Sequence, residues 1–306
     1  MTNAAAARII RLLLQLDWLR VRPEIECVTS LVSGSVDVIV QSLRTCHPDA
    51  SRFAAEWSDV LMEAQVLSGA NLIETCLHLL TCNSYEVQLA VLQRINALLT
   101  SSPANQDAAA RRDVIESELL REELMRIIES QDSYHKSVER SLQVLANILA
   151  ATSTSTWENS IQRKESFVRR CWNLLEHRQD SVRCAALHLW SFIWSSHSPL
   201  DDVINLTSLA DKLESLSTSS SSFESRAACA TFLLRNSHLL DADPRDVTRR
   251  DDVMRSWTLL VRLFEDEDDE VRRIVSKCNF QIKTDSPTSG QFFRVHVYHQ
   301  RMYCMY

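Results

Sequence analysis

A short polar turn followed at once by an apolar helix marks the centre of this chain. Residues 179–187 read Gln-Asp-Ser-Val-Arg-Cys-Ala-Ala-Leu. We predict that one helix ends near His177 and that the next begins with Asp180 or Ser181 as its N-cap, because such side chains accept a hydrogen bond from a free first-turn N–H. An apolar stripe follows at helical spacing: Val182, Ala185, Ala186 and Leu189. This pattern predicts a helical hairpin whose small alanines let a neighbouring helix approach closely.

The same pattern recurs along the chain. Polar turns precede six helix starts, at Val36, Val87, Val138, Val182, Ser225 and Val271. The spacing is close to the roughly 40 to 47 residues of a HEAT repeat, and a turn followed by Val-Arg resembles that repeat. We therefore predict an all-α fold, a HEAT/armadillo-like α-solenoid of about six helical hairpins over residues 1–283.

Glycine is almost absent, with three residues in 306, Gly34, Gly69 and Gly290. A glycine-rich phosphate loop or dinucleotide motif is excluded by this scarcity. Abundant Leu, Ala, Arg and Glu favour helix over sheet. The formal net charge of −7 argues against general nucleic-acid binding. No stretch is long and apolar enough to predict a membrane span.

Three local expectations follow from the pattern. Residues 114–129 read as one amphipathic helix, with Leu119 on its apolar side, and residues 223–240 read as another. Residues 284–306 break the helical pattern, so we expect an irregular, poorly packed C-terminal tail. The start of the chain lacks a polar capping helix, which suggests a piece of a longer protein.

The cysteines and acidic residues suggest packing more than chemistry. None of the nine cysteines forms a Cys-x-x-Cys pair, so we expect reduced thiols and a cytoplasmic location. His78–Cys82 and Cys184–His188 have the spacing of paired metal ligands, but a closed zinc site needs four, and helix packing is the preferred interpretation. The acidic run 265–270 lacks the glycine of a calcium loop and is interpreted as a solvated, helix-capping turn. We predict no metal, cofactor or catalytic residue.

Basic residues gather in two places. The candidates for binding RNA or a partner are Arg163, Lys164, Arg169, Arg170, Arg249 and Arg250. On one edge of a solenoid they would form a stripe for phosphates or an acidic protein. The alternative is ordinary surface charge, because Glu158, Glu165 and Glu176 are interleaved with them. Trp172, Trp190 and Trp194 cluster in the central hairpin and are interpreted as core.

Three segments together resemble the C-terminal part of the THADA family, the thyroid adenoma-associated protein homologues. They are residues 83–92 (Asn-Ser-Tyr-Glu-Val-Gln-Leu-Ala-Val-Leu), 180–186 (Asp-Ser-Val-Arg-Cys-Ala-Ala) and 264–272 (Phe-Glu-Asp-Glu-Asp-Asp-Glu-Val-Arg). The resemblance covers about residues 20–280, although a turn followed by Glu-Val-Arg is common among HEAT proteins. The chain is far shorter than the family, so autonomous activity is in doubt.

The resemblance implies a non-catalytic subunit. THADA-like proteins partner an FtsJ-type methyltransferase that modifies the 2′-OH of nucleotide 32 in the tRNA anticodon loop. The expected partners are that enzyme and tRNA, with no small-molecule substrate. The alternative is a general HEAT-repeat adaptor that binds proteins and no RNA. An enzyme is the third and least favoured hypothesis, which a deep pocket with converging His, Cys or carboxylate groups would revive.

Overall fold

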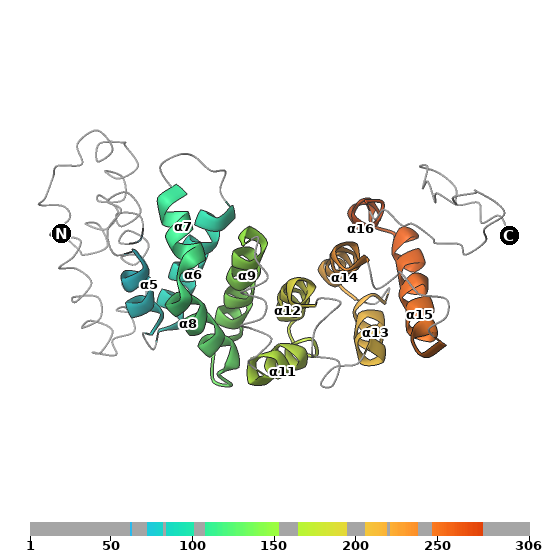
Figure 1. Cartoon of the computed structure of the whole chain (residues 1–306), viewed down its shortest axis with the longest axis horizontal. Helices are drawn as coiled ribbons and strands as arrows, with labels where there is room; N and C mark the ends of the chain where they lie inside the picture. The colour runs from blue at the N-terminus through green and yellow to red at the C-terminus, as the bar shows by residue number, and fades with distance from the viewer. Residues whose placement is uncertain are drawn as a thin grey trace, which may run out of the picture. The chain divides into compact units, whose positions relative to one another are not determined.

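A computed structural model describes residues 62, 72–81, 84–100, 108–152, 165–194, 206–218, 221–237 and 247–277. Eleven α-helices and no strand lie within these residues (Figure 1). The fold is all-α in the described parts, as the sequence pattern predicts. The tail at 284–306 and the first predicted hairpin lie outside the described residues.

The chain divides into two compact units, Met1–Trp157 and Glu158–Tyr306. The first contains five described helices: α5 (Leu72–Leu80), α6 (Tyr85–Thr100), α7 (Ala108–Glu116), α8 (Glu118–Glu129) and α9 (His135–Ala151). Helix α6 packs along α9, and α5 contacts α6 and α8. Asn96 and Asn147 join α6 to α9 through a side-chain hydrogen bond of 2.7 Å.

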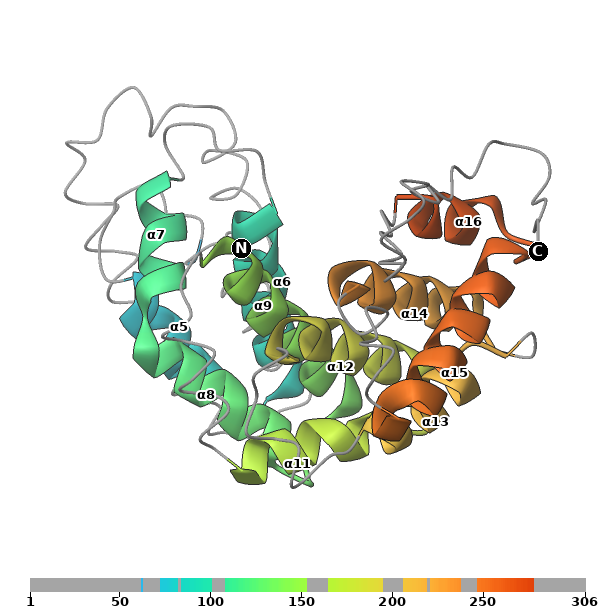
Figure 2. The same cartoon turned by 45° about the vertical axis from the view of Figure 1, so that its right-hand side comes forward.

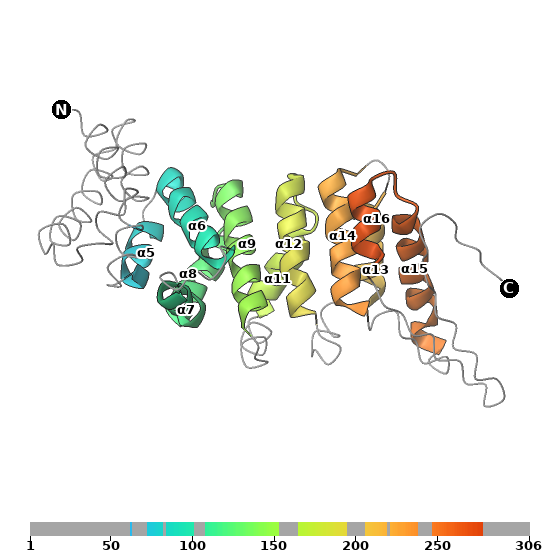
Figure 3. The same cartoon turned by 90° about the horizontal axis from the view of Figure 1, so that it is seen from above.

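The second unit contains six described helices: α11 (Glu165–Leu174), α12 (Asp180–Ile193), α13 (Leu206–Leu216), α14 (Phe223–Arg235), α15 (Val247–Phe264) and α16 (Asp269–Val275). Consecutive helices pair as α11–α12, α13–α14 and α15–α16. Helix α14 packs against both α12 and α16, and α13 packs against α15. Figure 3 shows α12, α14 and α16 side by side and nearly parallel.

The core of the second unit follows the predicted stripe. Val182, Ala185, Ala186 and Leu189 are all buried on α12. Trp190 is fully buried, and its ring meets that of Trp172 edge-on with centroids 5.8 Å apart. Burial of a large apolar side chain contributes about 1.5 to 3 kcal/mol, so this interior supplies much of the folding free energy. Trp194 is also buried at the end of α12, whereas Trp172 is half-buried, so the interpretation as core is confirmed for Trp190 and Trp194.

The predicted start of α12 is wrong by one or two residues. Gln179 is the N-cap, without a side-chain capping bond, and Asp180 is the first helical residue. The Asp180 carboxylate instead pairs with Arg183 three positions along the helix. A carboxylate in the first turn still favours the helix, because it lies at the positive end of the helix dipole.

The single helix predicted over residues 114–129 is two helices in the structure. Ser117 separates α7 from α8, and its Oγ accepts a 3.2 Å hydrogen bond from the Leu120 N–H, which caps α8. Figure 2 shows the bend between α7 and α8. Leu119, which the uninterrupted pattern placed on the apolar side, is 63% exposed. The Ser117 side chain caps the backbone in the middle of the apolar pattern, so a new helix begins there.

The helix predicted to reach residue 240 ends earlier, at Arg235. Asn236 leaves the helix, and its Nδ2 donates to the Ser191 carbonyl on α12 at 3.3 Å. The same amide nitrogen donates to the Phe232 carbonyl at 3.0 Å. Asn236 is buried, so these bonds satisfy a polar group and a late carbonyl of α14 together.

Candidate functional site

Four arginines occupy the same position in four helices. Each is the fourth residue of its helix. The residues directly before these helices are Ser117, Gln179, Ser222 and Asp268. We call the four arginines the turn arginines: Arg121, Arg183, Arg226 and Arg272. Gln88 holds the equivalent place in α6 after Ser84, and its Nε2 donates to the Leu80 carbonyl at 3.1 Å.

Every turn arginine donates a hydrogen bond from Nη1 to a backbone carbonyl before its helix. The acceptors are Ile115 for Arg121 at 2.8 Å, His177 for Arg183 at 3.1 Å, Ser221 for Arg226 at 2.7 Å and Asp266 for Arg272. Ile115 lies in the last turn of α7, and the other three acceptors lie in the turns between helices. Carbonyls at both kinds of place lack helical partners, so a guanidinium with five donors satisfies groups that the backbone leaves open. The recurring arginine therefore stabilises each turn in the same way.

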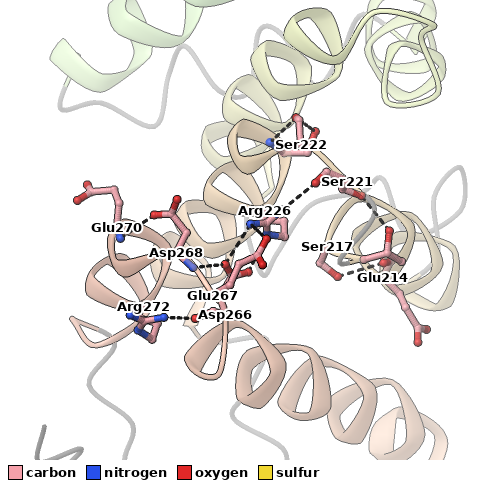
Figure 4. Close-up of polar contacts among 12 residues, drawn as sticks. Glu214, Ser217, Ser221, Ser222, Arg226, Asp266, Glu267, Asp268, Glu270 and Arg272 are labelled. Atoms are coloured by element: carbon pink, nitrogen blue, oxygen red, sulfur yellow. Dashed lines mark hydrogen bonds and ion pairs between the residues drawn. The ribbon is translucent and has the colours of Figure 1, made fainter. Parts of the chain in front are cut away.

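Arg226 connects two neighbouring hairpins (Figure 4). Its Nε donates to Asp266 Oδ2 at 2.8 Å and its Nη2 to Asp266 Oδ1 at 3.2 Å. The side chains are only 7% and 6% exposed, and Glu267 adds a weaker contact at 3.3 Å. The hydrogen bond that Arg226 donates to Asp266 raises the pKa of Arg226, which is charged at any physiological pH. This buried bidentate pair joins the start of α14 to the turn before α16.

The acidic turn 265–270 is a capping structure, as its sequence predicts. Asp268 is the N-cap of α16 and accepts from the Glu270 N–H at 2.9 Å. Asp266 Oδ1 accepts from the Asp268 N–H at 2.9 Å while it also binds Arg226. Glu267 and Asp269 are 82% and 94% exposed, so the outer carboxylates of the turn face solvent.

The predicted basic candidates are only partly described. Arg163 and Lys164 lie outside the described residues, and Arg249 and Arg250 lie in the first turn of α15, where only the backbone is described. Arg169 is 62% exposed on α11 and pairs with Glu165 one helical turn earlier. Only Arg169 and Arg170 have described side chains, so the six candidates stay a prediction.

Most other described basic side chains of the second unit are paired with carboxylates. Arg255 binds Asp211 and Glu214, and Arg262 binds Glu214 at 3.2 Å. The bond from Arg255 is the largest cause of the lowered pKa of Glu214. Glu214, Arg255 and Arg262 border a cavity of about 120 Å³ between α13 and α15, which is below the roughly 300 Å³ of ordinary small-molecule pockets. Charge on this surface is balanced.

The Cys184–His188 pair faces two different neighbours. Cys184 Sγ lies 3.5 Å from Ser225 Oγ, whereas the His188 ring packs edge-on against Phe192 at 5.4 Å. Burial lowers the pKa of His188, with a smaller effect from Arg235. Within the described residues no group of three or more His, Cys, Asp or Glu side chains is placed to hold a metal ion. Cys82, the partner of His78, lies outside them.

The sequence pattern marked Arg183 and Arg272 as residues that follow a polar turn, but it did not predict their hydrogen bonds to backbone carbonyls, and it missed two further features. Arg121 was hidden because the break at Ser117 was not foreseen. The Arg226–Asp266 pair joins residues 40 positions apart. The one sequence signal for it was that Arg226 follows a polar turn at the same position as Arg183 and Arg272.

Comparison of the chain with family models, curated proteins and solved structures finds no match. Among the described helices, none combines the length and the apolar character that crossing a bilayer requires. The described residues thus define an all-helical protein whose clearest repeated feature is the arginine-stabilised turn.

Proposed function

We propose that this chain is a non-catalytic helical-repeat scaffold of the HEAT/armadillo type that binds a macromolecular partner. One observation carries the proposal: the same arginine-to-turn hydrogen bond recurs at the start of four helices. The pairing of α11–α12, α13–α14 and α15–α16, with α14 packed between α12 and α16, supports a repeat of hairpins. An α-solenoid of about six hairpins extends this arrangement, and such repeats present broad surfaces for docking.

The resemblance to the THADA family gives the proposal a particular form. In that form the chain is a regulatory subunit that supports 2′-O-methylation of anticodon-loop nucleotide 32 by an FtsJ-type methyltransferase in the cytoplasm. The chain holds the enzyme or its substrate, and the methyltransferase supplies the chemistry. We expect no cofactor or small-molecule substrate for the chain itself.

The described charges favour a protein over RNA as the direct contact. A phosphate-binding surface needs several unpaired basic groups in a row. Arg169, Arg255 and Arg273 instead bind carboxylates of the second unit. The same observation supports the second candidate, a general HEAT-repeat adaptor that binds proteins without RNA.

The test is methylation of unmodified tRNA at nucleotide 32 by the FtsJ-type enzyme of the same source, with and without this chain. We expect the chain to raise the methylation rate. An unchanged rate, together with capture of other proteins from nuclease-treated extract, would favour the general adaptor.

Charge reversal tests the predicted basic surface. If RNA is bound through α11, Arg169→Glu combined with Arg170→Glu should weaken tRNA binding at low salt and leave the helical circular dichroism unchanged. The matched control is Arg273→Glu, since Arg273 is 60% exposed and also pairs within its own helix. Equal tRNA binding by all three proteins would rule out α11 as an RNA surface.

A further inference from the structure

Two exposed tyrosines meet on the surface of the first unit. Tyr85 is the first residue of α6 and Tyr134 directly precedes α9, and they are 49% and 36% exposed. Their ring centroids lie 4.8 Å apart with a tilt of 48°. The contact exists because α6 and α9 pack along each other and bring these helix starts together. Large aromatic groups left in water at the surface are typical of binding sites.

His135 adds a third ring. Its centroid lies 4.4 Å from that of Tyr134 with a tilt of 58°, and the residue is half-buried. We call Tyr85, Tyr134 and His135 the tyrosine surface. Phe223 occupies the first position of α14 in the second unit and is 37% exposed, but it has no ring contact among the described residues. An exposed aromatic residue at a helix start therefore does not by itself produce the ring contacts of the tyrosine surface.

Acidic residues lie close to both tyrosines in the sequence. Glu86 follows Tyr85 and accepts a 2.9 Å hydrogen bond from Ser84 Oγ. Hydrogen bonding to Glu86 is the largest cause of the raised pKa of Tyr85. The charged residues within two positions of the tyrosines are Glu86, the exposed Asp132 and Lys136. The local charge is negative.

We propose that the tyrosine surface binds an arginine side chain of a protein partner, an inference that rests on the proposed docking function. A guanidinium stacks on aromatic faces and donates to a carboxylate at the same time. The paired rings supply the face, and Glu86 supplies the acceptor beside it. Tyrosine and arginine are both enriched among the residues that dominate binding energy in protein interfaces.

RNA fits the same rings less well. Aromatic side chains also stack on bases, but such platforms combine stacking with a basic groove for the backbone. Here Glu86 and the exposed Asp132, each within two residues of a tyrosine, repel phosphate, and Lys136 offsets one of these two charges. The observations thus favour a basic protein segment.

The test uses the full chain and a fluorescein-labelled peptide of alternating glycine and arginine, followed by fluorescence anisotropy at low salt. Arginine should bind more tightly than citrulline, its uncharged near-isostere, in the same peptide. Tyr85→Leu combined with Tyr134→Leu should weaken binding about fivefold, because the aromatic faces are lost. Tyr85→Phe should retain binding, and Phe223→Leu, the control on the other unit, should bind as the unaltered chain does.

A second variant guards against a folding defect. Glu86→Gln keeps both rings and should weaken the arginine peptide about threefold, with unchanged circular dichroism. Unchanged binding by Glu86→Gln or by the double leucine variant would overturn the proposal. Tyrosine-dependent binding of a labelled oligouridylate in place of the arginine peptide would overturn it as well, since the surface would then serve RNA.

The outcomes separate this inference from the proposed function. A chain that fails to stimulate methylation but binds the arginine peptide through its tyrosines contradicts only the THADA-like role. A tyrosine variant that forms the methyltransferase complex as well as the unaltered chain, and binds the peptide equally well, contradicts only the tyrosine surface.

Discussion

Asp266→Asn is expected to destabilise the second unit by about 3 kcal/mol. The substitution removes the charge that faces Arg226 but leaves an amide oxygen for the Asp268 N–H. Arg226 and Asp266 are 7% and 6% exposed, so solvent screening, which reduces surface pairs to about 0 to 1 kcal/mol, has little effect here. Loss of one partner of a buried pair costs about 3 to 5 kcal/mol, because the other charge stays desolvated. The remaining bond to Ser221 places the estimate at the lower end.

Urea denaturation followed by circular dichroism measures this change. The matched control is Glu267→Gln, because Glu267 contacts the same guanidinium at 3.3 Å but is 82% exposed. Its effect should be below about 0.5 kcal/mol. Replacing both partners, as in Arg226→Met with Asp266→Leu, should cost less than Asp266→Asn alone, since no charge is then left buried. A loss below about 1 kcal/mol for Asp266→Asn, or one equal to that of the control, would refute the reasoning.

Three further predictions concern single residues. Arg183→Met should lower stability by about 1 to 2 kcal/mol, because a turn carbonyl loses its donor, whereas Arg169→Met should change it by less than about 0.5 kcal/mol; equal urea midpoints for the two would contradict the role of the turn arginine. Burial raises the pKa of Cys76 to about 12 and also raises that of Cys229, so iodoacetamide at pH 8 should modify both only after unfolding; rapid labelling of the native chain, seen by mass spectrometry, would contradict this. The pKa of Glu214 is lowered in the folded chain, so its contribution to stability is present above its unfolded pKa and is lost as pH falls through its folded pKa. The urea midpoints of Glu214→Gln and the unaltered chain should therefore converge below about pH 4. A difference between the two midpoints that widens in acid would contradict this prediction.

The sequence predicted the local parts of the fold well because helical periodicity is local. The apolar stripe that begins at Val182 and the capping role of the acidic turn both follow from residues within a few positions of one another. The break at Ser117 was missed because apolar residues continue on both sides of it. A single serine hydroxyl decided between one helix and two, which periodicity alone does not reveal.

The site features depend on contacts between distant residues. Arg226 and Asp266 belong to different hairpins, and Tyr85 and Tyr134 to different helices, so their pairing follows from packing and not from spacing. The basic candidates, in contrast, were predicted from residues that are close in sequence. Clustering in sequence suggested a stripe, which stays a prediction: Arg169 pairs with a carboxylate of its own helix, and four of the six side chains lie outside the described residues.

Sedimentation velocity of the nuclease-treated chain with the FtsJ-type methyltransferase of the same source tests the central claim most directly. A protein-binding scaffold predicts a new, faster-sedimenting species that contains both proteins without RNA. Independent sedimentation of the two proteins, or a complex that forms only after tRNA is added, would contradict direct protein docking on this chain.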